Sequence, residues 1–295
     1  MPSLTPNPAA PVRASGTFTV GTRQVHRLGF GAMRITGPDV WGEPANADQA
    51  RSVLREAIRL GVDFIDTAQA YGPEVSERLI AEALHPYPDG LLIATKGGIT
   101  RRDRHDPGRP DGRPERLRAD CEGSLKRLRV DTIDLWQLHR IDPDIPLEEQ
   151  IGTIRELRDE GKIRCFGISQ VTVEQLEHVR TLIEVATVQN RFNYADRAGE
   201  DVLAACETHG IGFIPWYPLA TGRLAGPGSP LAQAAARHHV TPSQLALAWL
   251  LHRSPVVIPI PGTGSIAHLR ENANAALIQL TSHELRALDA TSADD

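Results

Sequence analysis

Four side chains in the first half of the chain are of types that can move a proton together. Asp66 follows the apolar run 62–65, and Tyr71 stands five residues further on, in a loop that ends with a glycine. Lys96 and His139 follow two later apolar runs in the same way. Polar residues at the carboxyl ends of parallel strands face the functional rim of an α/β sheet or barrel. We therefore expect the carboxylate, the phenol, the ammonium and the imidazole to meet at one place.

The predicted chemistry of this set is protonation of an oxygen that is gaining negative charge. Desolvation would lower the pKa of a buried Lys96, and Asp66 is the counter-ion that keeps it charged. At ~4 Å and an effective dielectric of ~20, the ammonium would lower the pKa of Tyr71 by up to about three units, and burial opposes this. We expect a net decrease that lets Tyr71 give up a proton near neutral pH, while His139 hydrogen-bonds the same substrate oxygen. A carbonyl oxygen meets this description when hydride reaches its carbon.

Each of the four residues also has an ordinary structural interpretation. Asp66 could cap a turn and Tyr71 could be a packed aromatic. Lys96 could extend its ammonium to solvent, and His139 could be a hydrogen-bonded core residue. A different enzymatic interpretation is a Schiff-base aldolase or lyase, in which Lys96 traps a carbonyl. That role needs a neutral lysine, which the adjacent Asp66 disfavours. The occurrence of three of these residues on consecutive strand ends favours the proton-donating site.

The elements that would position these residues repeat one unit, a buried apolar strand followed by an amphipathic helix. Strands are predicted at 27–33, 62–65, 91–95, 133–138, 163–168, 186–190, 211–215 and 256–260. Helices are predicted from an Asp48 cap to residue 60, then near 74–84, 114–128, 146–160, 172–183, 199–208, 229–252, 265–278 and 282–290. Eight such units close into a (β/α)₈ TIM barrel, here with a short N-terminal hairpin (17–20 and 24–26) and an extra C-terminal helix. We expect residues 1–14 to be a flexible tail and residues 15–295 to be one domain.

Composition narrows the class of protein further. The 295 residues suit one α/β barrel, which needs ~250, and the net charge of −5 gives no support for nucleic-acid binding. Three scattered cysteines suggest a reduced, cytoplasmic protein without a metal, and no apolar run is long enough to cross a bilayer. The arginine- and aspartate-rich loop 97–113 is expected to be a solvated, mobile flap, with an anion site as the alternative. We expect a monomer.

The stretch Gly262-Thr263-Gly264-Ser265 follows the last predicted strand and begins a helix. Small residues, free backbone N–H groups and a helix N-terminus make a good phosphate cradle. The spacing of its glycines imitates a dinucleotide fingerprint of the Rossmann type. We reject that interpretation because no βαβ unit follows.

Six stretches of the chain, in this order, resemble the aldo-keto reductase family: GVDFIDTAQAYG, LLIATKGG, SLKRLRVDTIDLWQLHR, EGKIRCFGIS, VQNRFN and VIPIPGTGSIAHLREN. The resemblance runs from about residue 16 to residue 288. It implies a catalytic tetrad of Asp66, Tyr71, Lys96 and His139, with Tyr71 as the general acid. It also implies a nicotinamide cofactor that lies extended across the strand ends. We expect Trp41, Tyr71 and His139 to line the substrate pocket, with a surface position as the alternative for Trp41, which stands in a polar Gly/Pro loop.

The same resemblance implies the residues that contact the cofactor. Trp216 would stack on the nicotinamide, with Ser169 and Gln189 on its carboxamide. The full predicted set is Gly31, Met33, Asp66, Ser169, Gln189, Trp216, Pro218, Leu219, Thr221, Arg223, Ile260, Gly262, Thr263, Gly264, His268, Glu271 and Asn272. His268 and Gly262 stand where the family often has an arginine and a lysine for the 2′-phosphate. These departures weaken the expectation of NADPH over NADH, which we nevertheless retain.

The activity that the resemblance implies is reduction of an aldehyde or ketone by NADPH. The overall style of the sequence is similar to bacterial reductases that act on pyridoxal, so pyridoxal and small aromatic aldehydes are candidate substrates. A non-enzymatic alternative is a cofactor-sensing subunit of a channel, a role that some relatives have.

Overall fold

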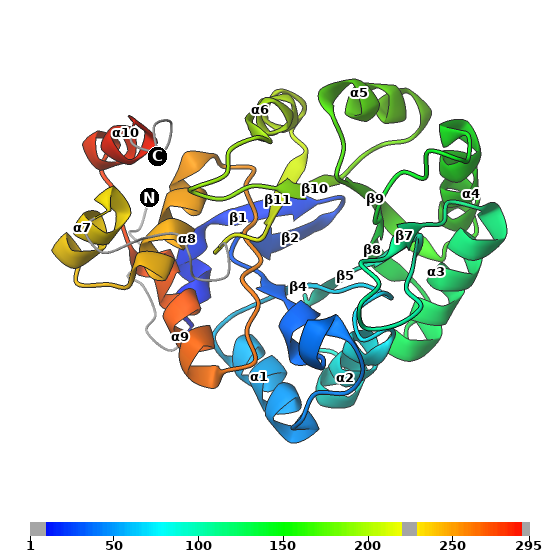
Figure 1. Ribbon diagram of the computed structural model, residues 1–295, viewed down its shortest axis with the longest axis horizontal. Helices are drawn as coiled ribbons and strands as arrows, with labels where there is room; N and C mark the ends of the chain where they lie inside the picture. The colour runs from blue at the N-terminus through cyan, green and yellow to red at the C-terminus, as the bar shows by residue number, and fades with distance from the viewer. Residues whose placement is uncertain (1–9, 220–228, 291–295) are drawn as a thin grey trace.

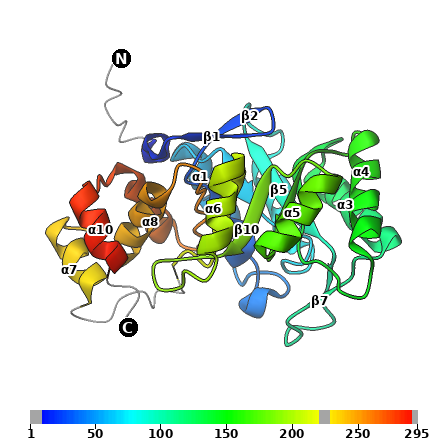
Figure 2. The same cartoon turned by 90° about the horizontal axis from the view of Figure 1, so that it is seen from above.

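The computed structural model describes residues 10–219 and 229–290, which form a curled parallel sheet surrounded by helices (Figure 1). The predicted hairpin is present as β1 (Thr17–Val20) and β2 (Arg23–His26), which pair antiparallel. Val20 and Val25 of this hairpin pack into the same buried cluster as Phe64 and Leu92 of the barrel strands. The hairpin therefore closes one end of the barrel interior, the upper end in Figure 2.

Seven parallel strands form the barrel wall, and their order is β11-β10-β9-β8-β5-β4-β3. Their bounds are β3 (Phe30–Gly31), β4 (Phe64–Asp66), β5 (Leu92–Gly97), β8 (Ile133–Leu138), β9 (Ile163–Ser169), β10 (Thr187–Arg191) and β11 (Gly212–Trp216). Each of these strands was predicted, although β3 is much shorter than the predicted 27–33. The predicted (β/α)₈ TIM barrel is confirmed.

The predicted eighth strand at 256–260 is the exception. This segment makes a single isolated bridge, between Val257 and Phe213, and is otherwise irregular. It still joins the two edges of the sheet, because Phe213 N–H donates to Val256 O at 2.8 Å and Gly29 N–H donates to Pro259 O at 2.9 Å. Pro259 and Pro261 have no N–H to donate, so a regular ladder cannot form. The barrel closes through this proline-containing segment.

Helices cover the outside of the sheet (Figure 1). Their bounds are α1 (Ala47–Arg59), α2 (Val75–Leu84), α3 (Pro114–Leu128), α4 (Leu147–Asp159), α5 (Val173–Leu182), α6 (Glu200–His209), α7 (Pro230–Arg237), α8 (Pro242–Arg253), α9 (Ile266–Asn274) and α10 (Ser282–Ala290). Short 3₁₀ helices are η1 (Pro11–Ser15), η2 (Ala32–Ile35), η3 (Pro38–Val40) and η5 (Ala275–Leu277). Among the described residues, no helix has the length and apolar character needed to span a lipid bilayer.

Three predicted helix boundaries are wrong. The cap of α1 is Asn46 rather than Asp48, because the Asn46 side chain accepts the Gln49 N–H at 2.9 Å. The predicted helix 229–252 is two helices, since a capping box at Thr241 starts α8 afresh. The predicted helix 265–278 ends at Asn274 and continues as η5.

The loop 97–113 contains a small antiparallel hairpin, β6 (Ile99–Thr100) with β7 (Arg109–Pro110), which the sequence did not predict. Arg101 ties this hairpin to the loop after β3. Its Nη1 donates to Val40 O at 2.6 Å, and its guanidinium lies 5.3 Å from the centre of the Trp41 ring. Figure 2 shows the hairpin at the opposite end of the barrel from β1 and β2.

Candidate active site

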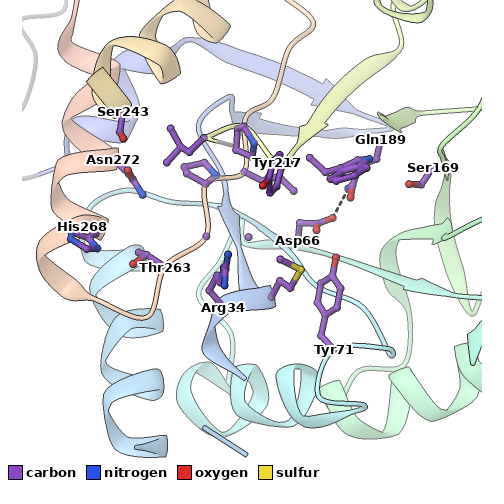
Figure 3. Close-up of a pocket in the computed structure, with 18 of the residues that line it drawn as sticks. Arg34, Asp66, Tyr71, Ser169, Gln189, Tyr217, Ser243, Thr263, His268 and Asn272 are labelled. Carbon is purple, nitrogen blue, oxygen red and sulfur yellow. Dashed lines mark hydrogen bonds between the residues drawn. The ribbon is translucent and has the colours of Figure 1, made fainter. Parts of the chain in front are cut away.

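A cavity of about 790 Å³ opens at the carboxyl ends of the strands (Figure 3). Sixteen of the residues predicted for the site line it: Gly31, Met33, Asp66, Tyr71, His139, Ser169, Gln189, Trp216, Pro218, Leu219, Ile260, Gly262, Thr263, His268, Glu271 and Asn272. Residues from the first, middle and last strand ends therefore share one space, as the barrel topology requires.

The four residues singled out first lie together at one end of this cavity. Lys96, at the end of β5, is fully buried, and its Nζ donates to Asp66 Oδ2 at 2.6 Å and to Thr67 O at 2.9 Å. The same ammonium donates to the Tyr71 hydroxyl at 3.4 Å. Tyr71 thus separates Lys96 from the cavity. The ring of His139 meets the Tyr71 ring edge-on, with 6.0 Å between their centres.

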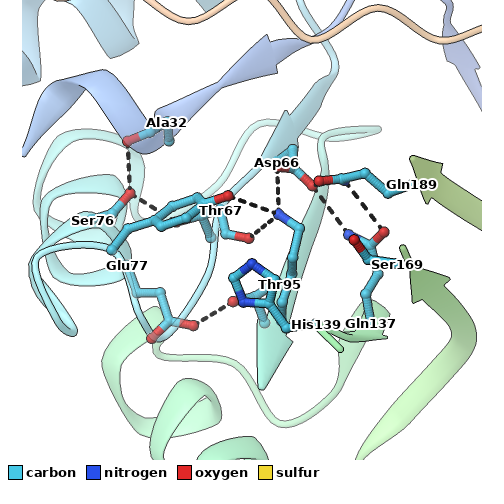
Figure 4. Close-up of polar contacts among 12 residues, drawn as sticks. Ala32, Asp66, Thr67, Ser76, Glu77, Thr95, Gln137, His139, Ser169 and Gln189 are labelled. Carbon is cyan, nitrogen blue, oxygen red and sulfur yellow. Dashed lines mark hydrogen bonds and ion pairs between the residues drawn. The ribbon is translucent and has the colours of Figure 1, made fainter. Parts of the chain in front are cut away.

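Two glutamines hold the other oxygen of the buried carboxylate. Gln189 Nε2 donates to Asp66 Oδ1 at 2.8 Å, and Gln137 Nε2 donates to the same oxygen at 3.1 Å (Figure 4). Both Asp66 oxygens are therefore occupied, which fixes the carboxylate and with it the position of Lys96. Gln189, predicted to hold the cofactor carboxamide, thus directs its amide nitrogen to Asp66 and also lines the cavity.

Burial and charge set the protonation of these groups. Burial lowers the pKa of Lys96, but Asp66 and Tyr71 more than offset it, so the pKa is raised and the amine stays charged. Burial raises the pKa of Tyr71 above its usual range, against the opposing effect of Lys96. The predicted net decrease for Tyr71 is wrong, because desolvation of the phenolate outweighs its attraction to the ammonium. Tyr71 is therefore a protonated phenol at neutral pH.

The imidazole of His139 is neutral. Burial lowers its pKa well below the usual value, and the positive charges of Lys96 and Arg140 lower it further. Its Nδ1 is enclosed and has no hydrogen-bond partner among the described residues. A neutral imidazole can donate one hydrogen bond to an oxygen beside Tyr71.

At the opposite end of the cavity, two glycines lie close to backbone carbonyl oxygens. A Cβ on Gly262 would come within 2.5 Å of Gly31 O, and a Cβ on Gly31 would come within 2.6 Å of Ile260 O. The segment then begins α9, where the Ser265 side chain accepts the His268 N–H at 3.4 Å. This cradle of backbone at a helix start fits the phosphates of an extended nicotinamide dinucleotide. No cluster of three potential metal ligands occurs in the residues described.

The remaining predicted residues lie elsewhere or outside the described chain. Trp41 and Gly264 are not among the residues that line the cavity, and Thr221 and Arg223 lie outside the described residues. Trp216 lines the cavity and donates its indole N–H to Gln170 Oε1 at 2.8 Å. That contact gives Gln170 a role in orienting the indole.

Sequence analysis missed six residues that line the cavity: Arg34, Arg140, Tyr217, Thr241, Ser243 and Pro261. Arg34 lies in η2, directly after β3, and its Cγ would be 3.6 Å from a Cβ on Gly262. Arg140 directly follows His139. The available signal was position: Arg140 stands just beyond the correctly predicted end of β8, and Arg34 directly follows the predicted strand 27–33.

The fold and the position of the cavity are those of a barrel enzyme with its site at the carboxyl ends of the strands. The sequence model of the Aldo/keto reductase family matches residues 27–293, and the chain belongs to this family. It is an NAD(P)H-dependent oxidoreductase.

Two relatives align with nearly the whole chain. An uncharacterized oxidoreductase of Schizosaccharomyces pombe is 48% identical over 93% of this chain and 89% of its own length. Pyridoxine 4-dehydrogenase of Escherichia coli is 40% identical over 95% of this chain and 99% of its own length. Among solved structures, an aldo-keto reductase of Klebsiella pneumoniae in complex with NADPH has a TM-score of 0.79 and 30% identity, covering 93% of this chain and 94% of that chain.

Proposed function

We propose that this protein reduces an aldehyde or ketone to an alcohol, with NADPH as the hydride donor and Tyr71 as the proton donor. The observation that carries the proposal is the contact of the Tyr71 hydroxyl with the Lys96 ammonium, itself held by Asp66, at the wall of the cavity. NADPH is supported by the backbone cradle at Gly31 and Gly262 and by the NADPH complex of the Klebsiella neighbour. When bound, the nicotinamide supplies the hydride.

The residues at the catalytic end act on the carbonyl oxygen. His139 and Tyr71 donate hydrogen bonds to it and so orient the carbonyl. As negative charge develops there, the phenol proton moves to the oxygen and Lys96 stabilises the phenolate that remains. An alcohol has a pKa near that of water, which is ~15.7, so it is a far weaker acid than a phenol. A Tyr71 pKa above its usual range therefore still leaves proton transfer to the alkoxide favourable.

The same contacts disfavour the Schiff-base alternative. Lys96 has a side chain that is 0% exposed, and its nitrogen already contacts Asp66, Thr67 and Tyr71. An amine in that position is charged, and Tyr71 separates it from the cavity, so it is poorly placed to attack a substrate carbonyl.

Pyridoxal is the substrate we propose to examine first, because pyridoxine 4-dehydrogenase is 40% identical over almost the whole chain. Small aromatic aldehydes are the second group. Loss of NADPH absorbance in the presence of each compound measures the activity directly.

The test of the mechanism is Tyr71→Phe. We expect kcat to fall about 10³-fold because the acid is lost, while NADPH binding, followed by fluorescence, is unchanged. Tyr87→Phe is the matched control, since the Tyr87 hydroxyl donates to Leu128 O, between α2 and α3, and does not line the cavity. Aldehyde reduction by Tyr71→Phe at the rate of the unmodified protein contradicts the mechanism.

A further inference from the structure

Arg140 places a cation at the catalytic end of the cavity that the proposed reaction does not use. It follows His139 directly, is half-buried and lines the cavity together with Tyr71. Its Nη1 donates to His139 O at 2.7 Å and to Ser169 Oγ at 3.3 Å. These two bonds hold the guanidinium between the ends of β8 and β9.

The rest of the guanidinium has no protein partner in the part of the chain that the structure describes. A guanidinium has five N–H donors, and the two bonds to His139 and Ser169 both use Nη1. No carboxylate among the described residues lies within 4.0 Å of it, and neither Nε nor Nη2 is enclosed by protein. The donors of Nε and Nη2 therefore remain for a ligand in the cavity.

The charges around Arg140 favour a negatively charged ligand. Asp66 is already paired with Lys96, and the other carboxylate that lines the cavity, Glu271, lies in α9 near the phosphate cradle. The catalytic end thus has a charged lysine balanced by its aspartate, plus an arginine that pairs with no carboxylate in the part of the chain described. A half-buried cation gains most from a partner that is charged and hydrogen-bonded, and a planar guanidinium suits carboxylate and phosphate oxygens.

Arg34 is a second cavity arginine with no carboxylate partner among residues 10–219 and 229–290. It lies against Gly262, at the end where the cofactor phosphates fit, so its charge has a use in the proposed function. Arg140 lies beside His139 at the end where the carbonyl is reduced. The position of Arg140 therefore points to the substrate rather than to the cofactor phosphates.

We propose that Arg140 binds an anionic group, a carboxylate or phosphate, on the carbonyl substrate, and so selects negatively charged aldehydes or ketones. The inference rests on the proposed reduction and deepens it by naming the substrate class. Arg140 is a specificity-determining residue here: it holds the far part of the substrate while Tyr71 and His139 hold the carbonyl oxygen.

The experiment compares charged and neutral aldehydes of matched shape. The 2-, 3- and 4-formylbenzoates are each compared with their methyl esters, and pyridoxal 5′-phosphate is compared with pyridoxal, so that the two arms separate carboxylate from phosphate. We expect the unmodified protein to prefer the charged member of at least one pair by tenfold or more in kcat/KM. Arg140→Gln should lower that preference at least tenfold, mainly through KM, and Arg140→Lys should restore part of it.

Arg164→Gln is the matched control, because Arg164 is an arginine of β9 that pairs with Asp134 and does not line the cavity. It removes the same charge and should leave the preference unchanged. The role of Arg140 is overturned if Arg140→Gln does not alter the preference for the charged aldehyde, or if Arg164→Gln abolishes that preference equally. In either case, turnover of the neutral esters still measures carbonyl reduction by itself. Absence of turnover with every aldehyde contradicts the proposed function instead. Calorimetric binding of the formylbenzoates then decides the inference, since Arg140→Gln must weaken binding at least tenfold.

Discussion

Two buried carboxylates on opposite faces of strand β5 have similar partners and different surroundings. Asp66 lies inside the barrel and accepts a hydrogen bond from Lys96 at 2.6 Å. Glu77 lies in α2, outside the sheet, where it accepts a hydrogen bond from Thr95 at 2.5 Å (Figure 4). It also accepts one from Arg127 at 2.6 Å. Thr95 and Lys96 are neighbours on β5, and adjacent residues of a strand point to opposite faces.

The difference between the two sites is what lies next to them. The Asp66–Lys96 pair contacts the Tyr71 hydroxyl, which lines the cavity, so the ammonium can act on a group that a ligand reaches. The Glu77–Arg127 pair joins α2 to α3 behind the strand, and Glu77 is fully buried. A buried ion pair can therefore take part in catalysis only where a reactive group connects it to a cavity, as Tyr71 does for the pair proposed to be catalytic. Elsewhere the same chemistry fastens elements together.

The largest expected effect is on the inner pair. Lys96→Met should lower kcat about 10³-fold, because the phenolate left by proton transfer loses its stabilising charge. Asp66 keeps the hydrogen bonds from Gln137 and Gln189, so the variant should remain folded by circular dichroism. If the kcat of Lys96→Met stays within tenfold of that of the unmodified protein, the inner pair does not differ from the outer pair in its effect on turnover.

The outer pair should respond in stability rather than in activity. Glu77→Gln leaves Arg127 without its closest carboxylate, and we expect the free energy of unfolding in urea to fall by about 3 kcal/mol. The kcat at 25 °C should change less than tenfold. The double variant Glu77→Gln with Arg127→Met should lose less stability than the sum of the two single variants. Simple additivity would contradict a stabilising interaction between Glu77 and Arg127.

A smaller effect is expected from His139, which is neutral in the folded protein. Its pKa is lowered by burial, so the unfolded chain takes up a proton first as pH falls below the ordinary value of ~6.5. Stability is therefore lost as pH falls below that value, by up to about 1.4 kcal/mol per pH unit. Urea unfolding at several pH values should show a shallower acid dependence for His139→Gln, and identical dependences would contradict the buried neutral imidazole.

The smallest effect is expected at an exposed ion pair. Arg118 of α3 contacts Glu156 of α4 at 2.8 Å and Glu160, directly after α4, at 2.7 Å, and neither glutamate belongs to either buried pair. Arg118→Gln should shift neither the urea midpoint nor kcat measurably, because solvent already screens these charges. A loss of stability as large as that of Glu77→Gln would show that the contribution of an ion pair to the free energy of unfolding does not depend on its burial.

The strand ends were the predictable part of this molecule. Long apolar runs of parallel strands are visible in sequence, and the residue after each run is then placed by topology alone. Asp66, Lys96 and His139 were found in this way, and the structure brings them together with Tyr71. Segment 256–260 was predicted to be a regular strand because its residues are mostly apolar. It makes only one isolated bridge, because Pro259 has no N–H to donate to a ladder.

The features of the site that were predicted wrongly or missed depend on how deeply each side chain is buried, which cannot be read from the sequence. The pKa of Tyr71 was predicted to shift in the wrong direction because the attraction to Lys96 and the opposing burial were both anticipated, but their relative size depends on how completely the phenol is desolvated in the fold. Arg34 and Arg140 were overlooked because an arginine is usually solvated, and only the folded barrel turns these two toward a cavity. The substrate contact predicted for Trp41 remains a prediction.

The close approach of Gly31 and Gly262 limits how coenzyme preference can change. Any larger residue at either position meets backbone carbonyl oxygen at 2.6 Å or less, so mutation there would push the barrel wall apart before it altered a ligand contact. We expect a redesigned variant that switches between the phosphorylated and unphosphorylated dinucleotide to change Arg34 and His268 instead, since both side chains line the same cavity. Libraries restricted to those two codons would sample the accessible changes.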